Sequence, residues 1–177
     1  MVRRSLLARG CGVALIGVLC ALALTEPVSA FTAATPAAIQ IKPGMSKPVI
    51  APSAFRAAAS GPSTLAATAH VGATVHFGAV AVKSVGFTVQ RALPGRRQGK
   101  RCVKPTARNG KAARCKRYKT VGRFRYAAKT QLGVVRFRFT GRVGGRRLKP
   151  GPYRLRCVPI SSTGTAGAPA FATFRIV

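Results

Sequence analysis

Large apolar residues alternate with polar or small residues along most of the chain beyond position 46. The alternation is clearest in five segments, at positions 75–77, 85–89, 135–139, 153–157 and 174–176. A period of two places successive side chains on opposite faces of a strand, so each segment predicts a β-strand with one buried face. Turns are predicted between them at Pro94-Gly95, Gly144-Gly145 and Pro150-Gly151-Pro152.

Short strands separated by Gly and Pro turns predict an all-β domain, either a sandwich or a barrel. Residues 46–177 suffice for one such core and are too few for two domains. No segment combines an apolar stripe at the helical period with capping residues at its ends. The preceding residues, 31–45, are rich in Ala, Thr and Pro, and they predict a linker.

Several short motifs within residues 46–177 resemble a known group of domains. They are Phe55-Arg56-Ala57-Ala58, Gly61-Pro62-Ser63, Phe87-Thr88-Val89 with Arg91, Arg101-Cys102-Val103, Cys115 with Arg117-Tyr118, Phe139-Thr140-Gly141-Arg142, Leu148-Lys149-Pro150-Gly151-Pro152-Tyr153 and Phe174-Arg175-Ile176-Val177. The set is similar to the carboxy-terminal immunoglobulin-like (fibronectin type III-like) domains of secreted proteins from high-GC actinobacteria. The resemblance implies an antiparallel immunoglobulin-like β-sandwich of about seven strands. It does not indicate a function.

Pro150, Gly151 and Tyr153 resemble the tyrosine corner of such sandwiches, which implies that the Tyr153 hydroxyl bonds to nearby backbone. The chain departs from the domains it resembles at Ser161-Ser162-Thr163-Gly164-Thr165, where those domains carry an Asp-x-x-Gly-Asn turn. We therefore expect no role here for that Asp in locking the turn or binding a cation.

The first thirty residues have the three zones of a secretory signal peptide. Arg3, Arg4 and Arg9 form a basic start, an apolar run follows at 11–24, and Val28-Ser29-Ala30 supplies small residues. The pattern predicts cleavage after Ala30. The apolar run is shorter than the roughly 20 residues of a permanent membrane span, which leaves an uncleaved anchor as the less favoured alternative. We expect a secreted or cell-surface protein with no stable membrane span.

The charge of the chain is almost entirely of one sign. The chain contains 31 Lys and Arg residues and a single acid, Glu26, which lies in the predicted signal peptide. Carboxylate acid/base pairs, Ser-His-Asp triads and hard-cation sites all require acidic residues. The sequence therefore predicts a non-enzymatic protein with no metal, no cofactor and no small-molecule substrate.

Most of the basic residues, 23 in all, lie between Arg91 and Arg156. The densest stretch, from Arg96 to Arg125, predicts a long basic hairpin that projects from the domain, because so many like charges cannot pack together. Its candidate polyanion-binding residues are Arg96, Arg97, Lys100, Arg101, Lys104, Arg108, Lys111, Arg114, Lys116 and Arg117. Outward-facing Arg136, Arg138, Arg154 and Arg156 could continue the charge as one stripe over a sheet face.

Such a surface suits repeating anionic polymers, because each neutralised phosphate or carboxylate releases a counterion. We expect a cell-surface or envelope interaction module that binds extracellular polyanions: envelope phosphopolymers, acidic polysaccharides, anionic lipid headgroups or DNA. Three alternatives stay open. The chain could be a nucleic-acid-binding protein, which is favoured only if the signal peptide is not used. It could also be an inert structural spacer, or its charge could serve solubility alone.

Three cysteines follow the predicted signal peptide. Cys102 and Cys115 flank the basic loop 103–114, and a disulfide between them would stabilise it by about 3 kcal/mol in the chain-entropy model. A zinc site is the competing interpretation, but two Cys residues without a nearby second pair or His do not match zinc-ligand spacing. Cys157 is expected to be a small buried residue, with a catalytic or intermolecular thiol as the alternative.

The histidines and two tyrosines carry weaker predictions. His70 and His76 have no carboxylate to orient them beyond position 30, so a metal or nucleophile role is not expected. His76 alternates with apolar neighbours, which predicts a solvent-facing strand position. Tyr118 and Tyr126 lie in the basic region and could stack on sugars or bases.

Overall fold

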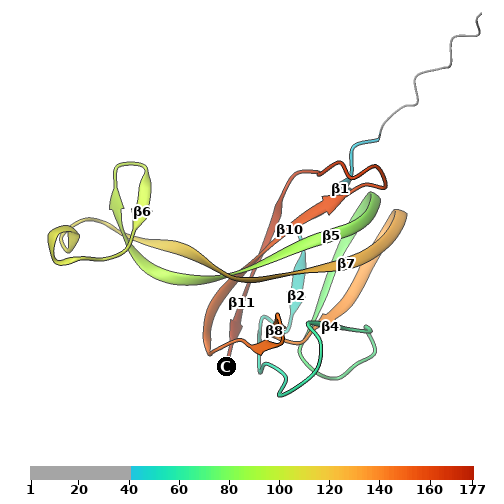
Figure 1. Ribbon diagram of the computed structural model, residues 1–177, viewed down its shortest axis with the longest axis horizontal. Coiled ribbons are helices and arrows are strands. Elements are labelled where there is room, and N and C mark those ends of the chain that lie inside the picture. Colours follow the sequence, from blue (N-terminus) through green and yellow to red (C-terminus); the bar gives the residue numbers. More distant parts are fainter. Residues whose placement is uncertain (1–40) are drawn as a thin grey trace, which may run out of the picture. The chain divides into compact units, whose positions relative to one another are not determined.

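Strands make up nearly all the regular structure of residues 41–177, the part of the chain that the computed structural model describes (Figure 1). These residues belong to one compact unit and contain no α-helix. The predicted signal peptide, its cleavage site and most of the predicted linker lie outside them. Residues 44 and 45, at the end of that linker, form a short strand that pairs with the domain.

Residues 41–177 contain eleven strands and one short 3-10 turn. In chain order they are β1 (Gly44–Met45), β2 (Val49–Ala51), β3 (Ala54–Phe55), β4 (Thr64–Leu65), β5 (Ala73–Gln98), β6 (Arg101–Val103), η1 (Ala107–Asn109), β7 (Arg114–Phe139), β8 (Arg142–Val143), β9 (Arg146–Arg147), β10 (Gly151–Ile160) and β11 (Ala170–Ile176). All five segments of alternating residues lie in β5, β7, β10 and β11. The all-β prediction is confirmed.

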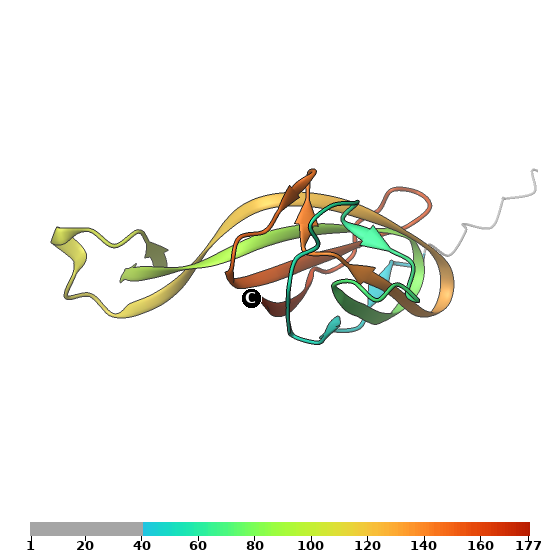
Figure 2. The same ribbon diagram turned by 90° about the horizontal axis from the view of Figure 1, so that it is seen from below.

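The antiparallel pair β5 and β7 forms a long ribbon that folds over on itself (Figures 1 and 2). The fold-over lies where the register shifts between Val82 and Ser84 of β5. One residue on each strand has a positive φ there: Ala81 on β5 and Lys129 on β7. An irregularity of this kind bends a ribbon sharply. The first layer contains 73–80 of β5 with 132–139 of β7, and the second layer contains 84–91 with 119–127.

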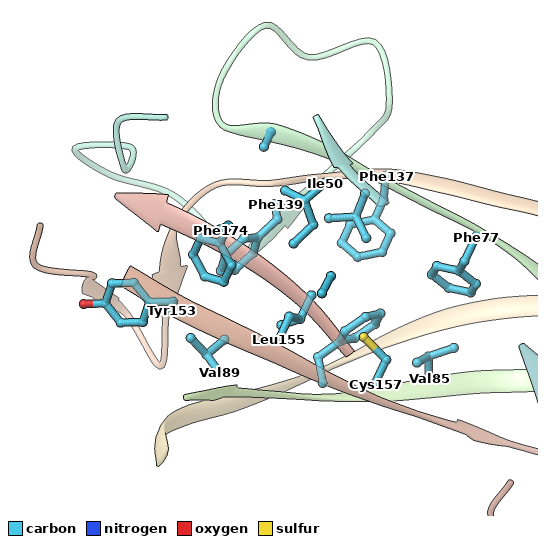
Figure 3. Close-up of a cluster of buried hydrophobic side chains, with 14 of the residues drawn as sticks. Ile50, Phe77, Val85, Val89, Phe137, Phe139, Tyr153, Leu155, Cys157 and Phe174 are labelled. Carbon is cyan, nitrogen blue, oxygen red and sulfur yellow. The ribbon is translucent and has the colours of Figure 1, made fainter. Parts of the chain in front are cut away.

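The hydrophobic core lies between these two layers (Figure 3). Phe137 of the first layer contacts Phe87 of the second with ring centroids 5.4 Å apart, and Phe139 stacks on Phe124 at 5.3 Å. Leu155 and Cys157 of β10 lie fully buried in the same core. Complete burial of a Phe or Leu side chain contributes about 1.5–3 kcal/mol, so the facing layers stabilise one another.

Strand pairing differs in part from the predicted arrangement. Nine strands form a single hydrogen-bonded sheet with the principal order β3-β11-β10-β5-β7-β4, and β8 and β9 form a separate pair. The sheet is mixed, because β3 lies parallel to β11. The chain passes from β2, which pairs with β5 in the first layer, to β3 beside β11 without reversing direction. A uniformly antiparallel arrangement is therefore wrong.

One of the predicted turns is also wrong. Pro94 and Gly95 lie inside β5, paired with Lys116 and Cys115 of β7. Gly144 and Gly145 do connect β8 to β9, and both have positive φ values. At the start of β10, the Tyr153 hydroxyl donates a hydrogen bond of 2.7 Å to the Lys149 carbonyl oxygen, four residues upstream.

Candidate functional site

The outer parts of β5 and β7, with everything between them, form the basic arm, defined here as residues 92–120. It extends away from the two layers (Figures 1 and 2). None of its residues belongs to the hydrophobic core of the described unit. Along the chain, the core residue that follows Val89 is Val135. Eleven Lys and Arg residues lie in this arm. Their mutual repulsion is relieved when the segment is extended in solvent, so a projecting hairpin is present as predicted. It is shorter than predicted, because Arg123 and Arg125 pair with Thr88 and Gly86 in the second layer.

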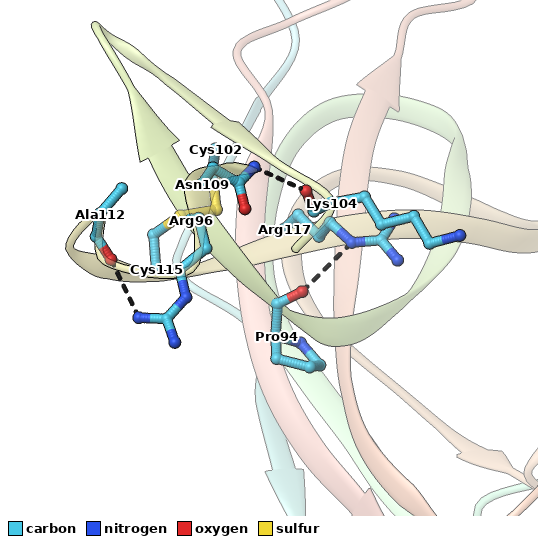
Figure 4. Close-up of a disulfide and its surroundings, with 8 residues drawn as sticks. All are labelled: Pro94, Arg96, Cys102, Lys104, Asn109, Ala112, Cys115 and Arg117. Atoms are coloured by element: carbon cyan, nitrogen blue, oxygen red, sulfur yellow. Dashed lines mark hydrogen bonds between the residues drawn. A yellow bond between two sulfur atoms is a disulfide. The ribbon is translucent and has the colours of Figure 1, made fainter. Parts of the chain in front are cut away.

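A disulfide ties the end of the arm together (Figure 4). Cys102 on β6 and Cys115 on β7 are joined, with their Cα atoms 6.0 Å apart, which confirms the predicted pairing. Both sulfur atoms lie over Gly95 of β5: a Cβ atom at that position would overlap the Cys102 sulfur and lie 3.2 Å from the Cys115 sulfur. Gly95 is thus required by close packing rather than by a turn.

Hydrogen bonds between side chains and the backbone shape the loop between the two cysteines. The Asn109 side chain accepts a bond of 2.8 Å from the Thr106 N–H and donates one of 3.0 Å to the Lys104 carbonyl oxygen. The Arg96 guanidinium donates to the Ala112 carbonyl oxygen at 2.9 Å (Figure 4). These bonds give the loop a defined course even though it lies outside the core.

Most of the predicted binding residues are free to meet a ligand. Eight of the ten are exposed, namely Arg97, Lys100, Arg101, Lys104, Arg108, Lys111, Arg114 and Lys116. Arg96 and Arg117 are half-buried, and each donates to a carbonyl oxygen within the arm; Arg117 bonds to Pro94 at 3.2 Å. They serve to shape the arm as well as to charge it. Lys119, outside the predicted set, is exposed on the same arm.

The expected stripe of arginines beyond the arm is divided. Arg136 and Arg138 lie on the outer side of the first layer, while Arg154 and Arg156 pair with β5 in the second layer. Since the core separates the layers, the two pairs lie on opposite faces, and a single stripe is wrong. Arg138 is further occupied by bonds to the Val71 carbonyl oxygen and the Thr74 hydroxyl.

Both tyrosines considered for stacking, Tyr118 within the arm and Tyr126 beyond it, have a ring face already covered. Tyr126 stacks on Phe137 with ring centroids 4.4 Å apart and packs against the core. Tyr118 is covered by the Arg154 guanidinium, whose central carbon lies 3.5 Å from the ring centroid. The same guanidinium is held by two bonds to Gln90 Oε1, at 3.0 and 2.8 Å. Neither tyrosine therefore adds an open aromatic surface to the exposed cations of the arm.

The remaining candidates for chemistry do not form a site. Cys157 is unpaired and fully buried, as expected, and burial raises the pKa of its thiol to about 12, so the thiolate nucleophile is absent at neutral pH. His70 is exposed, and His76 is half-buried between buried Val75 and Phe77. Within residues 41–177, no three His, Cys, Asp or Glu side chains gather into a potential metal site.

No helix among the described residues is long and apolar enough to cross a membrane. No protein-family model matches the chain, and no curated protein matches it either. The basic arm is therefore identified as the candidate site by its own geometry and charge.

Proposed function

We propose that this chain is a secreted, non-enzymatic interaction module of the cell surface or envelope that binds polyanions through the basic arm. The observation that best supports this proposal is that nine of the arm's eleven cations are exposed, while no Asp or Glu side chain occurs anywhere in residues 41–177. In other proteins, Lys and Arg side chains are commonly neutralised by nearby carboxylates. Here only an external partner, or small counterions, can neutralise them.

This arrangement favours the binding of anionic polymers over the binding of small anions. A polyanion that meets several side chains along the arm releases several counterions at once, so its affinity rises with the number of cations it neutralises and falls steeply with salt. The disulfide supports this by limiting the freedom of the loop before binding, which reduces the entropy lost on association. Envelope phosphopolymers and acidic polysaccharides are the partners that a secreted module would meet.

Duplex nucleic acid is the second candidate. At its base the arm is a two-stranded ribbon, with 92–94 of β5 paired to 116–118 of β7. The major groove of B-form DNA admits such a ribbon, and backbone phosphates on either side would meet the flanking cations. Groove entry predicts tighter binding to duplex DNA than to a single strand or to heparin at the same salt concentration.

The fold itself supports a proposed relationship to immunoglobulin-like domains. Two facing layers with a core between them are in keeping with a β-sandwich, and the bond from the Tyr153 hydroxyl to Lys149 has the form of a tyrosine corner. The mixed sheet and the folded ribbon are departures from the seven-stranded antiparallel arrangement. Secretion rests on the pattern of residues 1–30, and mass spectrometry of the protein recovered from culture medium tests cleavage after Ala30.

The arm is tested by removing four exposed cations, Arg97, Lys100, Arg101 and Lys104, each replaced by Ser. Affinity for heparin, a wall phosphopolymer and duplex DNA should fall. The slope of log affinity against log salt should become shallower by up to about 0.9 for each duplex phosphate that the variant no longer neutralises. Arg96 is left in place because its bond to Ala112 shapes the loop.

The matched control removes the same amount of charge elsewhere, by Ser at Arg56, Arg146, Arg147 and Lys149, all exposed outside the arm. If net charge alone drives binding, both variants should lose affinity equally, and the arm is not the site. If the protein binds none of these polymers at low salt, the inert spacer replaces our proposal.

A further inference from the structure

A second surface lies where the β5–β7 ribbon folds over, at the end away from the arm (Figure 1). Three short segments line a groove there of about 480 Å³: residues 44–46 with β1, 78–80 of β5 and 132–134 of β7. We call it the bend groove. The walls are largely apolar, because the segments contribute mostly Gly and aliphatic side chains.

Large aliphatic side chains project from this groove into solvent. Leu132 is 79% exposed and Val134 is 71% exposed, the two most exposed large hydrophobic residues in the described unit. Val80, the cross-strand partner of Leu132, is 40% exposed. Each lies on the outer side of the first layer, so none can be buried by the protein's own core. A contiguous exposed apolar patch commonly marks an interaction surface.

Exposed lysines frame the bend groove. Lys42 and Lys47 flank the 44–46 segment, Lys83 follows the 78–80 segment, and Lys129 precedes the 132–134 segment. Every wall of the groove thus has an exposed lysine within three residues. Lysine stems can lie along apolar surface while their ammonium groups reach outward to anions.

We propose that the bend groove docks on the surface of an anionic phospholipid bilayer. Leu132, Val134 and Val80 would enter the interfacial region, and the four lysines would meet the phosphate groups around them. The combination of a projecting aliphatic patch with basic residues is what peripheral membrane binding requires. A second copy of this chain is a poor occupant, because pairing through this face would bring two sets of lysines together without a carboxylate between them.

This proposal is independent of the arm, and the chain offers a clean reporter for it. The sequence contains no Trp, so Leu132→Trp introduces a single fluorophore at the patch. With protein released into culture medium, we expect its emission to shift to the blue on adding vesicles of equimolar phosphatidylcholine and phosphatidylglycerol, and brominated lipid should quench it. Val121→Trp, at a 41% exposed position near the arm, should show neither change.

Binding itself is measured by vesicle co-sedimentation. Leu132→Ser with Val134→Ser should weaken partitioning to the mixed vesicles by about tenfold or more, since two aliphatic side chains no longer leave water. Lys47, Lys83 and Lys129 replaced by Ser should also weaken it, by about tenfold or more. The four-residue arm variant should retain the Leu132→Trp shift even if it no longer binds polymers.

Three results would overturn the proposal. One is equal partitioning of the wild type and the Leu132→Ser, Val134→Ser variant, with no emission shift in the Leu132→Trp reporter. Another is disappearance of the shift in the arm variant, which would assign vesicle binding to the arm. The third is a concentration-dependent blue shift without vesicles, together with a dimer in sedimentation equilibrium, which would identify a second copy as the occupant.

Discussion

Several arginine side chains among the described residues donate hydrogen bonds to backbone carbonyl groups. Arg142 bonds to the carbonyl oxygens of Ala58, Ala59, Gly61 and Gly145, and so ties the 58–61 loop to the β8–β9 turn. Arg91 reaches the Pro150 carbonyl oxygen at 3.0 Å in the same manner. A guanidinium can serve several carbonyl groups at once, because its five N–H donors point in fixed directions.

Arg142→Lys tests this use of arginine. The ammonium keeps the charge but cannot reach all four carbonyl groups, so we expect the free energy of unfolding to fall by about 2 kcal/mol. Arg146→Lys, at an exposed position on β9, should change it by less than about 0.5 kcal/mol. Urea unfolding of both variants measures the difference, and equal effects would mean that the Arg142 network contributes only charge.

Tyr153→Phe tests the corner at the start of β10. The ring remains stacked on Phe174, but the Lys149 carbonyl oxygen loses its donor, which should lower the free energy of unfolding by about 1 kcal/mol. Tyr118→Phe removes a hydroxyl that makes no hydrogen bond within the described residues and keeps the ring beneath Arg154. If the two variants are equally stable, the corner bond makes no net contribution.

The arm is organised around the place where β5, β6 and β7 meet. β6 pairs with residues 96–98 of β5, and the Cys102–Cys115 disulfide closes the intervening loop over Gly95. The arm thereby holds a defined course without a hydrophobic core of its own. This suits the proposed role of the arm, which requires many like charges to be presented in solvent.

Gly95→Ala should disturb this junction and leave the layers intact. The added methyl group overlaps the Cys102 sulfur, so either the disulfide forms incompletely or the strands shift. We expect free thiol from Cys102 and Cys115 after oxidative refolding, measured by alkylation and mass spectrometry.

Gly110→Ala is the matched control, because the nearest atom to its new methyl group would be 3.6 Å away and its φ is −53°. It should form the disulfide completely. Complete oxidation of Gly95→Ala with wild-type stability would show that the junction tolerates a side chain.

The protein as a whole combines a tightly packed core with an unusually one-sided charge. Of the 31 Lys and Arg residues, three lie in the first thirty positions, which leaves 28 in the remainder without a single acidic side chain. Some of these charges lie on the extended arm and others on the outer faces of the two layers, which keeps them apart in space. We expect the free energy of unfolding to depend on pH through the few titratable groups within the core.

Alkaline pH should destabilise the protein through Cys157. Burial raises the pKa of its thiol from 9.0 to about 12, so between those values the unfolded chain has lost a proton that the folded protein retains. The contribution to stability is complete below pH 9 and is lost as the pH rises toward 12. The pKa of Tyr153 is also raised by burial, which acts in the same direction.

Cys157→Ala isolates this contribution, because the two proteins differ at no other side chain. The fall in unfolding free energy between pH 9 and 12 should be smaller in the variant by up to about 1.4 kcal/mol per pH unit. Unfolding by urea at a series of pH values measures it. Parallel curves for the two proteins would contradict the raised pKa of the thiol.

The alternation of residues by itself determined the strands and the face that each one buries. Val75, Phe77, Phe137 and Phe139 are buried and His76 is not fully so, as a period of two requires. The projecting arm and its disulfide could likewise be predicted, since like charges avoid packing and two flanking cysteines lie close along the chain. These are local properties, which neighbouring residues carry in their order.

Only the tertiary structure decided which surfaces lie together. The fold-over at Ala81 and Lys129 has no marker in the hydrophobic pattern, yet it turns one ribbon into two facing layers and divides the arginine stripe. Three of the acceptors of Arg142 are backbone carbonyl groups about eighty residues away, which carry no residue-type signature. Gly95 lies under a disulfide for the same reason: its neighbours are set by long-range pairing, and the sequence around it specifies only a small residue.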